Sequence, residues 1–143
     1  ILPFVGNFNS TLFTCPADRD ALQLQTQGFI QRDPYRYSFS LTSYDLSNNV
    51  FNPGMSTIIT RDRQVFPFRS ADIKSASEKI MLVEESRQTI NDSRWVPVGT
   101  HGDQNFVSNR HNGGKGNVVF ADGHLQAVTP DFGVNPTNSY PTF

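Results

Sequence analysis

The stretch from Gly116 to Val128, GNVVFADGHLQAV, constrains the fold of this chain more than any other segment. Two apolar runs, Val118–Phe120 and Leu125–Val128, flank the pair Asp122 and Gly123. Asp and Gly tolerate the positive φ angles that a type I′ turn requires at both central residues, so the pattern predicts a β-hairpin. Such a turn accounts for the Asp-Gly pair without any catalytic chemistry.

Two further segments predict strands. Within Tyr35–Leu46 the aromatic and apolar residues alternate with polar ones, so we expect one buried and one outward face. The set expected to be buried is Tyr35, Tyr37, Phe39 and Leu41, and the set expected to face out is Arg36, Ser38 and Ser40. The continuous apolar run Ile80–Val83, closed by Glu84, predicts a strand buried on both faces, with a buried helix segment as the alternative.

The remaining segments predict loops and little regular structure. Residues 16–27 favour one or two helical turns, and Thr57–Thr60 favours a short strand after a turn at Pro53 and Gly54. The polar residues 87–109 predict an excursion over the surface. The tail 129–143 contains three prolines and predicts a coil that packs through its rings. Those rings are Phe132, Tyr140 and Phe143.

Length and charge limit the classes of protein to which this chain can belong. A chain of 143 residues is long enough for one core, so we expect a single domain spanning 1–143. Lys and Arg number 12 against 13 Asp and Glu, and no basic cluster is present, which argues against a nucleic-acid partner. No run approaches the roughly 20 apolar residues that a membrane-spanning helix needs.

Cys15 is the only cysteine, so an internal disulfide is impossible. The surrounding sequence LFTCPAD contains no base next to the thiol, which a catalytic cysteine would need. Free cysteines usually behave as small hydrophobic residues. We therefore expect a buried structural cysteine.

Several polar residues are candidates for a metal or catalytic site. They are Glu84, His101, Asp103, His111, Asp122 and His124. Zinc would favour His with a carboxylate, and calcium would favour Asp122 with loop carbonyls. No pair has a recognised ligand spacing such as H-E-x-x-H, so the absence of a metal is the default expectation. A hydrolase triad of a serine with His111 and Asp122 lacks the Gly-x-Ser-x-Gly pattern, and we expect no catalysis.

The segment HNGGKG, residues 111–116, resembles a phosphate-binding loop only in its glycines. It lacks the Gly-Lys-Ser/Thr ending and precedes a strand, whereas a phosphate loop precedes a helix. We expect these glycines to let the chain turn tightly into the following strand.

Four separated landmarks, taken together, resemble a known family. They are LFTCPAD, YRYSFSLTS, SASEKIMLVEE and RHNGGKGNVVFADGHLQAV, in this order between Leu12 and Val128. The chain resembles the C-terminal globular part of bacterial type II secretion and type IV pilin-like proteins (pseudopilins) that carry a prepilin-type processing-associated H-X9-DG domain.

The family's motif residues correspond to particular positions of this chain. Its Cys-Pro corresponds to Cys15 and Pro16, its Ser-Glu and terminal Glu to Ser77, Glu78 and Glu84, and its His and Asp-Gly to His111, Asp122 and Gly123. Residues 112–121 separate the His from the Asp, and 121 − 112 + 1 = 10 positions is one more than the motif has. An extra loop residue costs little free energy, and the Gly-Gly-Lys-Gly segment is where it disturbs least.

The resemblance implies an α+β fold in which a short antiparallel β-sheet with long loops packs against an N-terminal helix. That long hydrophobic helix is missing from this sequence, so we expect the sheet to expose an apolar face where the helix belongs. Contact with a membrane would come only through that absent helix. We expect the strands near Tyr37–Leu41, Lys79–Val83 and Gly116–Val128.

The function that the resemblance implies is structural. The chain would be a subunit of a type II secretion or type IV pilus-like filament in the cell envelope or outside the cell, with other pilin-like subunits as partners and no turnover. Major pseudopilins use Ca²⁺ to order a C-terminal loop, which makes Asp122 a candidate ligand by resemblance; otherwise no cofactor is expected.

Two other functions remain open. In the first, the chain is an extracellular binding module whose aromatic loops recognise a polysaccharide or a secreted substrate, with Trp95 and Tyr140 as ligand-binding residues if their rings are exposed. In the second, it is a metal-dependent hydrolase, which would require His101, His111 and His124 to converge.

Overall fold

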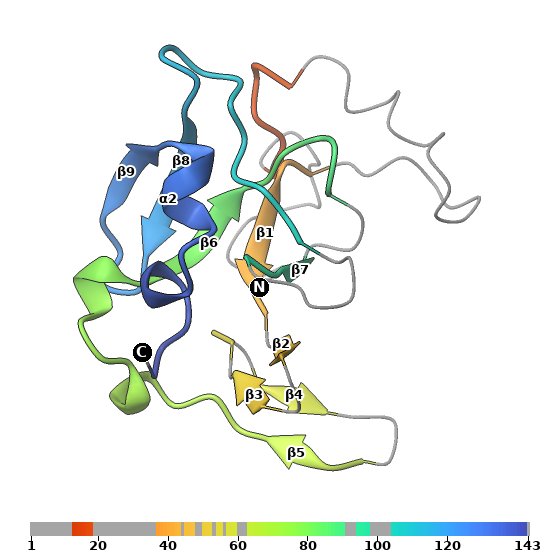
Figure 1. The fold of residues 1–143 in the computed structure, drawn as a ribbon, viewed down its shortest axis with the longest axis vertical. Coiled ribbons are helices and arrows are strands. Elements are labelled where there is room, and N and C mark those ends of the chain that lie inside the picture. Colours follow the sequence, from red (N-terminus) through yellow and green to blue (C-terminus); the bar gives the residue numbers. More distant parts are fainter. Residues whose placement is uncertain are drawn as a thin grey trace.

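The chain folds as a small α+β domain with little helix, seen in a computed structural model (Figure 1). The structure describes residues 13–18, 37–43, 45–47, 50–52, 54–55, 57–59, 63–90, 94–97 and 104–142. The main sheet has five strands in the order β7-β1-β6-β8-β9. These are β1 (Phe39–Thr42), β6 (Ile80–Glu84), β7 (Arg94–Trp95), β8 (Gly116–Phe120) and β9 (Leu125–Val128).

The other described elements are short. Strands β2 (Asp45–Ser47) and β3 (Val50–Asn52) form one two-stranded sheet, and β4 (Ile58–Ile59) and β5 (Val65–Phe66) form another. The helical elements are the 3₁₀ turns η3 (Ser70–Asp72), η4 (Ala76–Glu78) and η5 (Pro136–Asn138) and the α-helix α2 (Pro130–Gly133). Among the described residues, no helix has the length and apolar character needed to cross a bilayer.

The main sheet is mixed, whereas the resemblance implied an antiparallel one. Strands β1, β6, β8 and β9 pair antiparallel, but β7 pairs parallel with β1. Both edges of β6 are already occupied, by β1 and β8. The chain that leaves β6 therefore returns along the outer edge of β1, and this route makes β7 parallel to β1.

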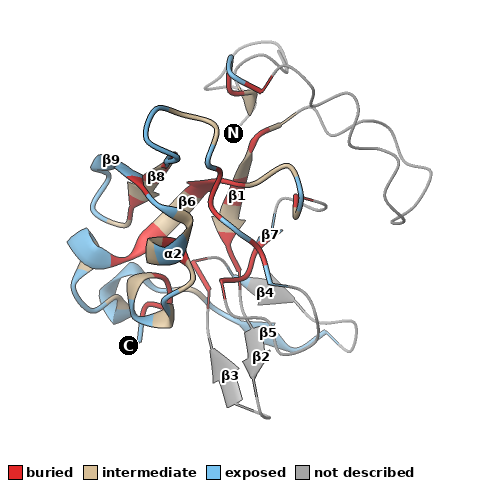
Figure 2. Cartoon of the chain, turned by 45° about the horizontal axis from the view of Figure 1, so that its top comes forward, coloured by how far each residue is buried: buried red, intermediate tan, exposed pale blue. Residues whose placement is uncertain are grey.

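One face of the sheet carries the hydrophobic core. Figure 2 shows burial concentrated on β6 and the neighbouring strands, with β9 exposed at the edge. The buried cluster consists of Ile80, Val83, Trp95, Val107, Val118, Phe120 and Val128. The prediction that Ile80–Val83 forms a strand is confirmed, at the centre of the sheet, but the strand is not fully buried on both faces, since Met81 and Leu82 are only partly buried.

The C-terminal segment packs on the core face through its rings, as expected, but it forms α2 and η5 where a coil was expected. Phe132 of α2 packs edge-to-face on Phe120, with ring centroids 6.2 Å apart. A Cβ atom at Gly133 would collide with the Val107 side chain, so the glycine lets α2 approach the core closely. Proline fits the first turn of a helix, which is why Pro130 and Pro136 begin α2 and η5 rather than preventing helical structure.

The faces of β1 are opposite to the prediction. Ser38, Ser40 and Thr42 are buried, while Phe39 and Leu41 are only partly buried. Burial of a hydroxyl costs little when it finds a hydrogen-bond partner. Here Thr42 Oγ1 donates to the Ile80 carbonyl at 2.5 Å, and Ser38 Oγ donates to Asp18 Oδ2 at 2.7 Å.

The opposite face of the sheet carries an apolar row across four strands. The strand register places Leu41 beside Leu82, Leu82 beside Val119, and Val119 beside Leu125. The first three side chains are partly buried, and Leu125 is 71% exposed. This row is named the open-face row below.

The predicted hairpin is present as β8 and β9, but its turn differs from the predicted type I′ turn. The N–H of Gly123 donates to the Phe120 carbonyl at 2.9 Å, and the N–H of Phe120 donates to the His124 carbonyl at 2.9 Å. The loop therefore has three residues, of which only Gly123 has a positive φ, at 92°. A three-residue loop needs one left-handed residue, typically glycine, at its third position.

The segment 87–109 was expected to run over the surface, but part of it enters the core. Trp95 in β7 and Val107 are fully buried, and Asn105 and Ser108 are buried beside them. The Asn105 Oδ1 accepts the N–H of Val96 at 2.8 Å, so a polar side chain satisfies the buried backbone. Because most residues of 87–109 are polar, their composition did not indicate that β7 belongs to the core.

Some predictions lie wholly or partly outside the described residues. Most of the helical turns expected over 16–27 and the beginning of the strand expected from Tyr35 fall there, as do Pro53 and Phe143. Strand β4 lies within the predicted Thr57–Thr60.

The three-residue turn predicts a specific response to substitution. Gly123→Ala should lower the free energy of unfolding by about 1–2 kcal/mol, because a left-handed φ strains a Cβ-bearing residue, and Gly123→Asn should cost less. Asp122→Gly should not stabilise the protein, since Asp122 does not have a positive φ. Urea unfolding measures all three; a gain in stability from Asp122→Gly would indicate a type I′ turn instead.

Candidate functional site

Three segments far apart in the sequence meet at the end of β6. Nε2 of His111 lies 2.7 Å from Glu84 Oε2 and 3.5 Å from Cys15 Sγ. The three ligand atoms lie within 4.8 Å of one another. These three residues are called the Cys-Glu-His cluster below.

Local structure positions each member of the cluster. Glu84 ends β6 and shares a face with Leu82, two residues earlier. The N–H of Cys15 donates to Ser38 Oγ at 3.0 Å, and this bond ties the 13–18 segment to the start of β1.

The loop after His111 turns back through two glycines. Gly113 and Gly114 have φ angles of 75° and 68°, and the N–H of His111 donates to the Lys115 carbonyl at 3.1 Å. Residues with side chains rarely adopt these φ values. The expectation that the Gly-Gly-Lys-Gly segment lets the chain turn tightly into a strand is confirmed.

Asn117 completes the surroundings of the buried Glu84 carboxylate. Its backbone N–H and its Nδ2 donate to Glu84 Oε2 at 3.1 and 3.2 Å. The second oxygen, Oε1, lies 3.6 Å from Arg110 Nε and accepts no hydrogen bond within the part of the chain that the structure describes. Glu84 is therefore hydrogen-bonded through Oε2, whereas Oε1 has only the longer contact with Arg110.

A second buried carboxylate, Asp18, lies beside the cluster. Arg110 Nη1 contacts its Oδ2 at 2.5 Å, and Arg87 Nη2 lies 3.6 Å from its Oδ1. Arg110 also donates to Ser108 Oγ at 2.6 Å and to the Glu85 carbonyl. Arg110 thus links Asp18, Glu84 and the backbone of Glu85, the residue directly after β6.

The geometry does not suit nucleophilic catalysis. In a Cys-His-acid arrangement the thiol and the acid contact different nitrogens of the imidazole, which lets the ring move a proton. Here both contact Nε2. Burial raises the pKa of the Cys15 thiol, and the neighbouring Glu84 raises it further, so the thiol is a weak nucleophile. Cys15 as a whole is only 4% exposed, as expected for a structural cysteine.

Asp122 and Gly123 lie at the other end of β8, away from the cluster. Asp122 Oδ1 accepts the backbone N–H of His124 at 3.1 Å and contacts its Nδ1 at 2.7 Å. The His124 ring stacks on Phe120, with centroids 4.3 Å apart. Among the described residues, Asp122 and His124 belong to no group of three metal ligands. His101 and Asp103 lie outside the described residues.

The exposed rings that a binding module would need are not provided by Trp95 and Tyr140. These residues are 0% and 1% exposed, respectively. Trp95 belongs to the core cluster because β7 joins the main sheet, and Tyr140 is buried where the tail folds back. Their assignment as ligand-contacting surface residues is therefore corrected.

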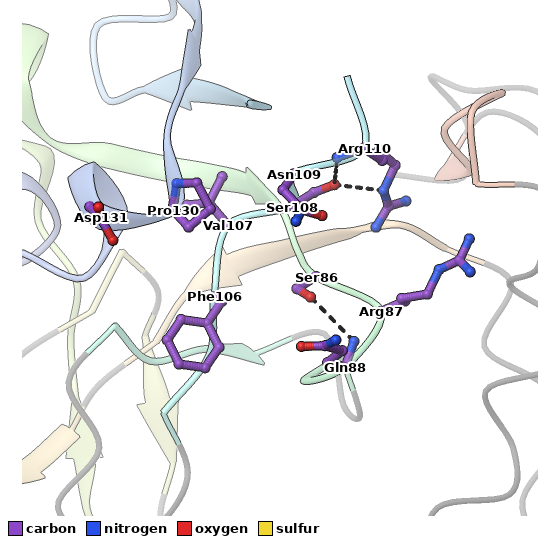
Figure 3. A pocket seen from close by; sticks show the side chains of 10 residues that line it. All are labelled: Ser86, Arg87, Gln88, Phe106, Val107, Ser108, Asn109, Arg110, Pro130 and Asp131. Atoms are coloured by element: carbon purple, nitrogen blue, oxygen red, sulfur yellow. Dashed lines mark hydrogen bonds between the residues drawn. The ribbon is translucent and has the colours of Figure 1, made fainter. Parts of the chain in front are cut away.

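A surface pocket of about 530 Å³ lies beside Arg110 (Figure 3). Figure 3 shows Arg87 and Arg110 on one side of it and the half-exposed Phe106 with Pro130 on the other. The lining residues are Ser86, Arg87, Gln88, Phe106, Val107, Ser108, Asn109, Arg110, Pro130 and Asp131.

Sequence reasoning identified the three cluster residues but missed the partners around them. Asp18, Ser38, Arg110 and Asn117 lie inside the landmark segments, but they are ordinary polar residues there and none was a candidate site residue. Their place in those segments was the only local signal. Their roles depend on contacts made across the fold.

The two arginines beside Asp18 predict unequal effects on stability. Arg110→Met should lower the free energy of unfolding by about 3–5 kcal/mol, because it leaves buried carboxylates uncompensated. Arg87→Met is the matched control and should cost less than about 1 kcal/mol, since the Arg87 side chain is 39% exposed against 10% for Arg110. If chemical denaturation shows equal losses of unfolding free energy for the two variants, Arg110 does not stabilise the buried network more than Arg87 does.

The Asp122–His124 contact predicts an acid-dependent contribution to stability. Hydrogen bonds from the His124 backbone and then its side chain lower the pKa of Asp122 below its ordinary 3.8. A carboxylate with a lowered pKa stabilises the fold above pH 3.8, and this contribution disappears as the pH falls through the folded-state value. The melting temperature of wild type should exceed that of Asp122→Ala at neutral pH, and the gap should narrow below pH 3.8; a constant gap would contradict this.

Comparisons with known proteins give no match: no family model matches the chain, and neither a curated protein nor a solved structure does. The inference of function therefore depends on the residues, their geometry and the resemblance of the motifs.

Proposed function

We propose that this chain is the globular domain of a pilin-like subunit that acts by assembling into an envelope or extracellular filament, without turnover. The observation that carries the proposal is the open-face row. A domain of this kind packs a long apolar helix on one face of its sheet, and that face must be apolar and continuous across strands.

The open-face row meets this requirement. Leu41, Leu82, Val119 and Leu125 lie directly opposite one another on four adjacent strands. An apolar side chain gains about 25 cal/mol for each Å² removed from water, so partly exposed leucines and valine favour a covering element. An N-terminal helix of the same protein is the occupant that the resemblance implies.

The Cys-Glu-His cluster supports the proposal in a second way. The resemblance identified Cys15, Glu84 and His111 from separate motifs, and these residues lie together around a buried carboxylate. Cys15 and Glu84 are buried, so two of the three residues offer little surface to a substrate and hold the fold together. This favours a structural subunit over an enzyme.

The exposed edge of the sheet offers a surface for contacts between subunits. Strand β9 ends the five-stranded sheet, and its first three residues are exposed. Unpaired strand edges and exposed apolar residues are typical of surfaces that bind other chains. Large apolar side chains are exposed at Val65, Phe66, Phe106 and Leu125.

A binding module is the second candidate function, and the pocket beside Arg110 is the observation that favours it. Phe106 is 37% exposed at its edge and provides a ring for a sugar or peptide to contact. This function would be supported if the protein binds a polysaccharide and Phe106→Ala abolishes that binding. Val65→Ala is a matched control that should leave binding unchanged, because it removes an exposed apolar side chain elsewhere.

The experiment that tests the filament proposal is intact-mass analysis and N-terminal sequencing of the protein from its native source. We expect a processed N-terminus with an N-methylated aromatic residue, followed by a long apolar helix. A native start close to Ile1, or an ordinary secretory signal before it, would contradict the filament and leave the binding module as the better account.

A further inference from the structure

We propose that Cys15, Glu84 and His111 form a Zn²⁺-binding site. Thiolate sulfur, imidazole nitrogen and carboxylate oxygen are the three protein ligand types that zinc uses. The chain supplies one of each, from the 13–18 segment, the end of β6 and the loop before β8.

The distances between the ligand atoms suit a tetrahedral metal. With bond lengths of about 2.3 Å to sulfur and about 2.0–2.1 Å to nitrogen and oxygen, tetrahedral angles separate sulfur from nitrogen by about 3.5 Å and nitrogen from oxygen by about 3.3 Å. The Cys15 Sγ to His111 Nε2 distance is 3.5 Å, and the Nε2 to Glu84 Oε2 distance is 2.7 Å. The Nε2 to Oε2 distance would have to lengthen by roughly half an ångström on metal binding, and all three ligand atoms already lie within 4.8 Å of one another.

The convergence on a single nitrogen separates a metal site from a catalytic triad. Sγ lies 3.5 Å, Oε2 2.7 Å and Asn117 Nδ2 3.1 Å from Nε2, so these contacts gather at one imidazole nitrogen instead of forming a proton relay through both. Three protein ligands leave one coordination position for water. The His111 side chain is part exposed, so solvent reaches the cluster from its side.

The two anionic ligands supply the charge that a dication would balance. Glu84 is fully buried and its Oε2, the proposed ligand atom, accepts from Asn117, while Arg110 Nε lies 3.6 Å from the other oxygen, Oε1. Zn²⁺ replaces the thiol proton of Cys15, which is released to solvent, and the dication then balances the thiolate and the carboxylate. Asn117 orients the carboxylate through two donors, as outer-shell partners of metal ligands do.

The chemistry selects zinc over calcium. Ca²⁺ requires six to eight oxygen ligands, whereas the cluster offers one carboxylate together with sulfur and nitrogen. The Asp122–His124 pair provides an internal control, because its N···O distance is also 2.7 Å but no cysteine or third ligand accompanies it in the described structure.

Titration of the whole 143-residue chain tests the proposal directly. The protein is reduced, freed of metal with a chelator, and titrated with Co²⁺ as a spectroscopic substitute for Zn²⁺. We expect a thiolate-to-cobalt absorption band in the near ultraviolet that saturates at one equivalent and disappears when Zn²⁺ displaces the cobalt. Saturating Zn²⁺, at about 100 times its Kd, should raise the melting temperature by roughly 5–10 °C, and Ca²⁺ should not.

Substitutions identify the ligands. Cys15→Ser should abolish the thiolate band, and Cys15→Ser and His111→Gln should each weaken Zn²⁺ binding by roughly 100-fold or more, because even loss of an outer-shell partner costs about 10–100-fold. Asn117→Ala should fall in that smaller range, and His124→Gln should bind as wild type does. Absence of the band, or Zn²⁺ affinity that survives Cys15→Ser and falls in His124→Gln, would overturn the proposal.

A measurement on the wild-type protein covers the case in which a variant does not fold. One equivalent of Zn²⁺ should slow alkylation of the Cys15 thiol in the native state by at least 10-fold, whereas Ca²⁺ should leave the rate unchanged. An alkylation rate that Zn²⁺ does not alter would contradict thiolate coordination.

Discussion

The burial of the Glu84 carboxylate at the end of the central strand is the constraint on which the arrangement of this protein depends. Transfer of a charged group from water to the interior costs several kcal/mol unless partners replace the water. Asn117 and His111 supply those partners at Oε2, and Arg110 approaches Oε1. Because these residues come from β8 and the loop directly before it, satisfying one carboxylate brings this later segment of the chain to the end of β6. Arg110 extends the network to Asp18 and so to the segment that carries Cys15.

The two faces of the sheet have different roles, and the buried network lies on the less covered one. The core face is closed by α2 and the tail, through Phe132 and Gly133. Glu84 shares the other face with Leu82, a member of the open-face row, because residues two apart on a strand point the same way. A covering helix would therefore lie next to the Cys-Glu-His cluster. On the proposed function, the cluster lies at one end of this face and the covering helix would pack on the apolar row beside it.

How much of this the sequence reveals depends on the range of the interactions. The run Ile80–Val83 and the hairpin Gly116–Val128 were predictable, since apolar pattern and turn residues act locally. The turn type was not, because Asp-Gly suits several hairpin loops and the strand register decides among them. The buried face of β1 was predicted wrongly because Ser38 and Thr42 find hydrogen-bond partners in other segments. Burial of Trp95 could not be foreseen from its polar neighbours, because it follows from the parallel pairing of β7 with β1.

By itself, the sequence determined which segments form the central strand and the hairpin, that a single free cysteine is buried, and which motif residues to examine. Only the tertiary structure decided that Cys15, Glu84 and His111 share one site. Their separations along the chain, 96 residues between Cys15 and His111 and 27 between Glu84 and His111, are bridged by strand pairing and the tight glycine loop. The physical reason is that the pattern of apolar and polar residues along a segment reflects only whether that segment is buried and how it turns. The Cys-Glu-His cluster depends instead on which strands become neighbours and in what register they pair.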